Sequence, residues 1–134
     1  KTGFDCFADD TGLEVKALNG MPGVFSKRFA GINANSEENI DKLLNLLENQ
    51  TDRSAQFKTI ISLHLNGEIK TFEGICKGNI AYEKMGEFGF GYDPIFIPEN
   101  KELSFGQMSM QDKNKIAHRG KAIKKLIDYL TNLY

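Results

Sequence analysis

The chain has 134 residues, of which 40% are hydrophobic and 26% are charged, and this composition is typical of one ordinary globular domain. Its formal net charge is −1, so it lacks the basic excess with which nucleic-acid-binding domains usually neutralise phosphates. No apolar run approaches the length of a membrane span, and no signal peptide is visible, although a missing start would hide one. We therefore expect a cytoplasmic protein that binds neither nucleic acid nor membrane.

The first chemically informative segment is the run from Ala8 to Gly12, which contains Asp9 and Asp10. Paired aspartates can hold magnesium, a hard cation that prefers oxygen ligands and keeps waters that can attack a substrate. Taken alone, two adjacent acids fit a polar turn after a short strand better. The aromatic and glycine cluster at 89–94 and the basic stretch at 113–119 favour a site for a divalent cation and a polyphosphate, because one site could use all three segments.

A helix followed by a β-hairpin is predicted for the middle of the chain. Residues 35–38 resemble a capping box, and they precede apolar residues at helical spacing, namely Ile40, Leu43, Leu44 and Leu47. Residues 57–65 alternate between apolar and polar side chains, which predicts a strand, and Asn66-Gly67 is typical of a tight hairpin turn. An antiparallel strand should follow from Glu68 to about Lys77. His64 falls on the more polar face of the first strand, where a surface histidine is a better interpretation than a metal ligand.

The rest of the chain divides into a loop region and a helical end. Residues 80–98 are rich in glycine and proline, so we expect loop or short strand there. Ser109 to Asp112 is a plausible helix start, and Gly120 is expected to mark a break between two helical pieces. The lysines at 121, 124 and 125 are interpreted as the solvated face of the second piece.

No internal repeat, linker or low-complexity tract divides residues 1–134, so we treat them as one domain. Strands and helices are mixed rather than regularly alternating, and the two strands of the hairpin should be antiparallel. The two cysteines, Cys6 and Cys76, lie far apart without a C-x-x-C pattern. A disulfide framework or a zinc site therefore has little support, and we expect both thiols to be reduced and partly buried.

Three motifs in a fixed order make the chain resemble the inosine triphosphate pyrophosphatase family, and the match runs across most of the chain. The motifs are ADDTGLEVKALNGMPGVFSKRFAG, FGFGYDPIF and KNKIAHRGKA. Enzymes of this family hydrolyse inosine, deoxyinosine and xanthosine triphosphates to the monophosphate and pyrophosphate with magnesium, and so clear damaged purines from the nucleotide pool. The resemblance also implies a homodimer. Its fold would be α/β, with a long mixed sheet, flanking helices and a cleft between two lobes.

One departure from the family pattern concerns the amino terminus. The family begins with a strand and a Ser/Thr-x-Asn-x-x-Lys loop that grips the phosphates, followed by a metal-binding glutamate, and neither precedes Lys1. We therefore expect the amino-terminal part of the fold to be missing from this chain. The chain acting alone is expected to be inactive, because the phosphate loop and the metal ligand supply positioning and charge stabilisation together.

The resemblance assigns the chemical step to the first motif. Asp10 matches the family's aspartate, which would bind magnesium and help to take a proton from the attacking water. Asp9 is expected to support Asp10. Thr11 stands where the family usually has serine, and its hydroxyl can still donate to a phosphate oxygen.

The resemblance assigns the nucleoside to the other two motifs. An aromatic face would stack on the purine, and a glycine would let the backbone approach, in the run Phe90, Gly91, Tyr92 and Asp93. Lys113 would lie near the base or the phosphates as a point charge, and His118 would orient the base edge or donate to it.

Arg119 is expected to read the base edge. Its guanidinium only donates hydrogen bonds, so it would favour the carbonyl at position six of inosine and xanthosine over the amine of adenosine. Two donors facing each other would leave both unsatisfied. Guanine carries the same carbonyl, so Arg119 cannot exclude it.

Two hypotheses from different classes remain open. The first is a magnesium-dependent enzyme that hydrolyses non-standard purine triphosphates. The second is a nucleotide-binding fragment without catalysis, in which the base pocket persists without the phosphate loop. A different phosphoanhydride hydrolase on the same fold is a third and weaker option.

Overall fold

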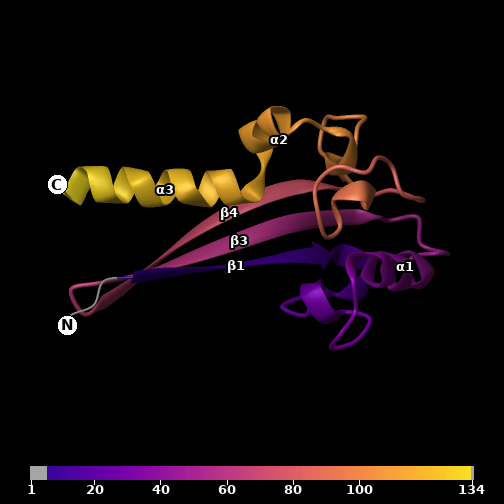
Figure 1. Ribbon diagram of the computed structural model, residues 1–134, viewed down its shortest axis with the longest axis horizontal. Coiled ribbons are helices and arrows are strands. Elements are labelled where there is room, and N and C mark those ends of the chain that lie inside the picture. The colour runs from indigo at the N-terminus through magenta and orange to yellow at the C-terminus, as the bar shows by residue number, and fades with distance from the viewer. Residues whose placement is uncertain (1–5, 134) are drawn as a thin grey trace.

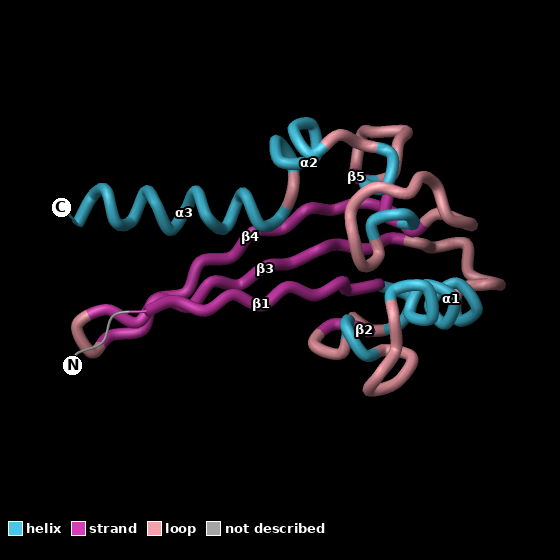
Figure 2. The backbone as a smooth tube through the Cα atoms, viewed as in Figure 1, coloured by secondary structure: helices cyan, strands magenta, loops and turns pink. Residues whose placement is uncertain are grey.

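The computed structural model describes residues 6–133, and its centre is a five-stranded sheet (Figures 1 and 2). The strands lie in the order β2-β1-β3-β4-β5, and all their pairings are antiparallel. Their bounds are β1 Cys6–Val15, β2 Pro22–Gly23, β3 Ser54–Leu65, β4 Glu68–Ile80 and β5 Phe96–Pro98. Three long strands, β1, β3 and β4, run the length of the sheet, whereas β2 and β5 pair only near one end.

The β3–β4 hairpin confirms the predicted alternation. Asn66 and Gly67 form its turn with φ angles of 54° and 81°, the left-handed values that such a turn needs. Every second side chain of β3 from Ala55 to Leu63 is buried, and His64 is exposed. Both strands are longer than predicted, because the ladder continues between residues 54–56 and 77–79.

Helix α1 (Ser36–Leu46) begins with the capping box predicted from the sequence. The Asn35 side chain accepts a hydrogen bond from the Glu38 backbone amide, and the Glu38 carboxylate accepts one from the Asn35 amide. These bonds satisfy amides that the first turn of a helix leaves without partners. The buried residues Ile40 and Leu43 join Leu13 of β1 in the main core.

The helical end divides at Ala117 rather than at Gly120, so the predicted position of the break is wrong. Helix α2 (Met110–Ile116) is capped by Ser109, and helix α3 (His118–Leu133) starts immediately after Ala117, whose ψ of 151° is extended. Gly120 lies within the first turn of α3. The extended residue turns the chain so that α3 runs alongside β4, as Figure 1 shows.

Helix α3 begins directly over β4. A Cβ atom on Gly74 would lie 2.0 Å from the carbonyl oxygen of His118 and 2.5 Å from the backbone nitrogen of Ala122. Further along, Ala122 and Leu126 of α3 pack with Ile61 of β3 in a second core cluster. The absence of a side chain at position 74 therefore sets how closely the first turn of α3 approaches the sheet.

Two lysines of α3 protect the outer edge of β4. The ammonium of Lys121 donates to the carbonyl of Ile75 at 2.9 Å, and that of Lys125 donates to the carbonyl of Glu73 at 2.7 Å. These carbonyls lie beyond the short stretch of β4 that β5 covers. Both lysines are exposed, as expected, and in addition they satisfy backbone carbonyls at this edge of β4.

One face of the sheet carries the core. Cross-strand partners share a face and adjacent residues alternate, so Leu13, Phe57 and Cys76 form one buried row. Cys76 is a free thiol whose pKa is raised by burial, which agrees with the expected reduced state. The side chain of Cys6 lies outside the part of the chain that the structure describes. The opposite face is more polar and carries Asp10, Gly12, Glu14, Gln56 and Lys58.

The predicted α/β class, with helices flanking a sheet, is confirmed. The strand pairings that the structure describes are all antiparallel. The expected second lobe, with a cleft between the lobes, stays a prediction. Within residues 6–133, no helix is long and apolar enough to cross a membrane.

We expect Gly74→Ala to lower the free energy of unfolding by about 1–3 kcal/mol, because the added methyl group forces α3 away from β4. Urea unfolding followed by circular dichroism measures this change. Thr71→Ala on the exposed side of the same strand is the matched control, with an expected change within about 0.5 kcal/mol. Equal stability of the two variants would contradict the close packing at Gly74.

Candidate functional site

The buried carboxylate of Asp93 organises the loop that precedes it. Its Oδ2 atom accepts a hydrogen bond from the backbone amide of Phe90 at 3.0 Å and one from the ammonium of Lys113 at 2.6 Å. A Cβ atom on Gly89 would lie 2.1 Å from the same oxygen, so only glycine leaves room for the carboxylate. One side chain therefore fixes the loop and joins it to α2.

Lys113 lies inside this cluster rather than on the surface. The side chains of Lys113 and Asp93 are only 9% and 5% exposed, so the two charges depend on each other. The ammonium lies 4.8 Å from the ring centre of Phe90 and 5.4 Å from that of Phe105, within the range of cation–π attraction. Lys113 thus brings the loop, α2 and the core aromatic residues together.

The two aromatic residues of the loop have different environments. Phe90 is 76% exposed, so its outer face is available to stack on a base. Tyr92 is buried, and its hydroxyl donates to the carbonyl of Ser26 at 2.6 Å. Burial also raises the pKa of Tyr92, so it stays a neutral donor. Gly91 lies between the exposed Phe90 and the buried Tyr92, and its φ of 61° is in the left-handed region.

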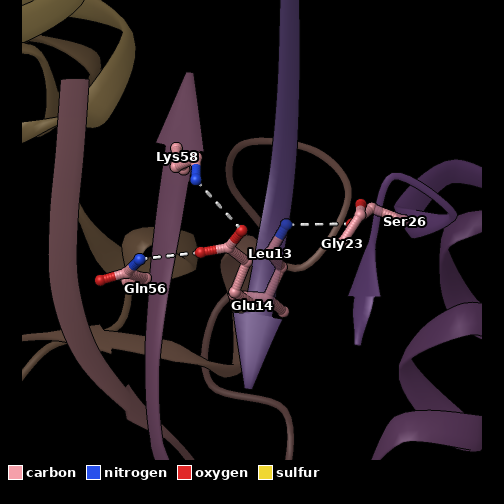
Figure 3. Close-up of polar contacts among 6 residues, drawn as sticks. All are labelled: Leu13, Glu14, Gly23, Ser26, Gln56 and Lys58. Carbon is pink, nitrogen blue, oxygen red and sulfur yellow. Dashed lines mark hydrogen bonds and ion pairs between the residues drawn. The ribbon is translucent and has the colours of Figure 1, made fainter. Parts of the chain in front are cut away.

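Ser26 extends this anchor to the first strand (Figure 3). Its hydroxyl accepts a hydrogen bond from the amide of Leu13 at 2.9 Å and donates to the carbonyl of Gly23 at 2.7 Å. Tyr92 therefore ties the aromatic loop to β1 and β2 and serves as a positioning residue.

His118 is buried against the core at the start of α3. Its ring stacks on Phe57 with centroids 4.7 Å apart, and among the described residues its Nδ1 atom has no hydrogen-bond partner. Burial lowers the pKa of His118 to about 4, assisted by the positive charges of Lys113, Arg119 and Lys121. The imidazole is therefore neutral at physiological pH and offers an unused polar atom.

Arg119 reaches across the sheet to β1, where its guanidinium forms an ion pair with Asp9. The arginine side chain is 58% exposed and that of Asp9 is 29% exposed. The sequence led us to expect that Asp9 supports Asp10. In the structure the partner of Asp9 is Arg119, and Asp9 holds the guanidinium in position.

Asp9 and Asp10 lie within β1, so the interpretation of this pair as a turn is wrong. Adjacent strand residues point to opposite faces. Asp9 shares the face of Ile61 and α3, and Asp10 shares the face of Ile60. The exposed Asp10 lines a small hollow of about 60 Å³ together with Gly12, Gly23 and Lys58.

Thr11 lies on the same face as Asp9. Its hydroxyl is 2.8 Å from that of Thr59, its cross-strand partner. The phosphate contact expected of Thr11 requires its hydroxyl to leave this bond or to share it.

The residues around Asp10 could supply part of a site for a divalent cation. Within the described part of the chain, no group of three His, Cys, Asp or Glu side chains could hold a metal by itself. Magnesium commonly uses one or two carboxylates with phosphates and waters rather than a complete protein cage. Asp10 supplies one exposed carboxylate of that kind.

The structure brings most of the predicted nucleoside residues together. Hydrogen bonds and an ion pair link Phe90, Asp93 and Lys113. Phe105 contacts Lys113 and also His118, and the ring centroids of Phe105 and His118 are 6.4 Å apart. Asp10 lies on the other face of the sheet. Sequence reasoning missed Glu14 and Lys58, which share the face of Asp10. The two-residue period of a strand could have placed Glu14 there, whereas the pairing with Lys58 depends on the register.

Residues 1–129 match the model of the Ham1 family. A dITP/XTP pyrophosphatase of Flavobacterium psychrophilum is 56% identical, and the match covers 98% of this chain and 70% of the relative. Its counterpart in Flavobacterium johnsoniae is 57% identical and is matched over 98% of this chain and 68% of its own length. The solved structure of the Staphylococcus aureus Ham1 protein superposes with a TM-score of 0.94 at 48% identity, covering 97% of this chain and 68% of that one.

We expect acid to destabilise the protein through His118. The lowered pKa means that the unfolded chain binds a proton between about pH 6.5 and 4 while the folded chain does not, so stability falls as pH falls through this window. Urea unfolding at several pH values should show a weaker pH dependence in His118→Gln than in the parent protein. His64→Gln, on the exposed part of β3, is the matched control for the loss of an imidazole. An unchanged slope in His118→Gln would contradict the buried neutral state.

Proposed function

The chain belongs to the Ham1 family, and we propose that it is a magnesium-dependent pyrophosphatase of non-standard purine nucleotides. Its substrates would be ITP, dITP and XTP, which it would cleave to the monophosphate and pyrophosphate and so remove from the nucleotide pool. The family assigned from the three sequence motifs is confirmed. The observation that carries the proposal is the cluster that joins an exposed aromatic ring, a buried lysine and a neutral histidine next to Arg119.

The cluster supports recognition of a purine with a carbonyl at position six. Phe90 offers an open ring for stacking, and Asp93 fixes the backbone that carries it. Arg119 is exposed and oriented by Asp9, so it can donate to a base edge without first being ordered. The amine of adenine would face this donor and leave it unsatisfied.

The polar face of β1 supports the phosphate chemistry. When bound, magnesium neutralises phosphate charge and supplies an activated water. Asp10 would hold it and accept the proton of the attacking water, a role that an exposed carboxylate can fill. Glu14 and Lys58 lie on the same face of the sheet as Asp10.

Pyrophosphate release from ITP, dITP, XTP, ATP and GTP with magnesium tests the proposal in the full-length gene product. We expect the three non-standard nucleotides to be hydrolysed much faster than ATP. Asp10→Asn should lose turnover by about a hundredfold or more while it retains ITP binding, because the carboxylate acts on the chemical step.

Asp128→Asn, an exposed substitution on α3, is the matched control and should retain full turnover. Near-normal turnover of Asp10→Asn would remove Asp10 from the mechanism. Nucleotide binding without any turnover by the parent protein would support the noncatalytic alternative, and preference for another phosphoanhydride would support a different hydrolase.

We expect Arg119→Ala to reduce kcat/KM for ITP by about ten- to a hundredfold and to affect ATP less, because one charge-assisted bond to the carbonyl is lost. Lys124→Ala on the exposed side of the same helix is the control for charge. Measuring kcat/KM for ITP and for ATP in parallel gives the ratio of the two values in each variant. Equal losses for ITP and ATP would show that Arg119 does not read the base.

The homodimer and the cytoplasmic location implied earlier stay predictions.

A further inference from the structure

Lys58 occupies a position on the polar face of the sheet that the proposed reaction has not yet used. It lies on β3 directly opposite Gly12 of β1, so it shares a face with Asp10 and Glu14 on either side of Gly12. Figure 3 shows its ammonium directed toward Glu14, with Nζ and Oε2 3.5 Å apart. Gln56 donates to the other oxygen of Glu14 at 2.8 Å.

The register allows Lys58 to turn toward Asp10 as well. Diagonal neighbours across an antiparallel pair lie roughly 7–8 Å apart, which is within the reach of a lysine. Gly12 places no side chain between the two residues. Lys58 lines the same small hollow as Asp10, Gly12 and Glu14, so its ammonium can reach this space from either carboxylate.

The resting ion pair with Glu14 is easily exchanged. The side chains of Lys58 and Glu14 are 29% and 31% exposed, so solvent screens their attraction and the pair contributes little to stability. A phosphate group offers more negative charge and several acceptor oxygens to the same ammonium. Lysine suits such a ligand because its charge sits at the end of a flexible stem.

We propose that Lys58 binds a phosphate of the triphosphate next to Asp10, and that Glu14 holds the ammonium at this position until the substrate replaces it. The inference rests on the proposed function and assigns two further residues to the same site. Glu14 acts as a positioning residue that competes with the substrate for Lys58. Gln56 keeps the Glu14 carboxylate turned toward β3.

Two substitutions with opposite expected effects test the proposal in the full-length gene product. Lys58→Met should raise the KM for ITP and weaken the binding of inorganic tripolyphosphate, each by about tenfold, because one charge-assisted contact is lost. Glu14→Gln should tighten tripolyphosphate binding, because it removes the competitor for the ammonium. Binding of inosine, which has no phosphate, should be the same in both variants. Lys77→Met is the matched control, since Lys77 lies on the same face opposite Gln56 and farther from Asp10.

Calorimetry with tripolyphosphate makes the test independent of turnover. A parent protein that shows no hydrolysis but binds tripolyphosphate through Lys58 would overturn the proposed function and support this inference. Unchanged tripolyphosphate affinity in Lys58→Met, or no tripolyphosphate binding by the parent protein, would overturn the inference even if ITP is hydrolysed. A purely structural ion pair would weaken binding in both variants together with their thermal stability, and that result would also overturn it.

Discussion

The buried ion pair between Asp93 and Lys113 is the interaction on which the rest of the candidate site depends. It joins a glycine-rich loop to α2, and the loop side of the pair also holds the backbone of Phe90. A buried charge whose partner is removed is strongly destabilising, so the loop and the helix must keep their relative positions for either charge to be tolerated. Only Ala117 separates α2 from α3, so the same ion pair also fixes where α3 begins, at His118.

The sheet divides the site into two parts with different chemistry. On the core face, aromatic rings surround Lys113 and His118, and this apolar setting keeps the imidazole neutral. On the other face, Asp10 and Lys58 remain accessible to water and ions. The adjacent residues Asp9 and Asp10 connect the two parts, because strand geometry sends one carboxylate to each face. Asp9 can therefore form its ion pair with Arg119 on one face while the Asp10 carboxylate stays exposed on the other.

Local patterns in the sequence predicted the regular elements well. The capping box at Asn35 and the turn at Asn66-Gly67 are signals that act within a few residues, and both are confirmed. The break lies at Ala117 rather than at Gly120, next to the turn of α3 that packs against Gly74, a residue far away in the sequence. Likewise, the partner of Asp9 and the role of Lys121 depend on which strand lies next to which helix. Such contacts are set by register and topology, and propensity alone carries no information on them.

The charges of the site explain how a chain with a net charge of −1 can accommodate a polyanion. Three cations of the site are each paired with one carboxylate, namely Lys113 with Asp93, Arg119 with Asp9 and Lys58 with Glu14. The pairs differ in exposure, and this difference determines their roles. The buried pair cannot be exchanged without leaving an uncompensated charge, so it provides structure. The two accessible pairs are screened by water and separate at little cost. Under the proposed function they would hold two donors in position and still leave them available to a nucleotide.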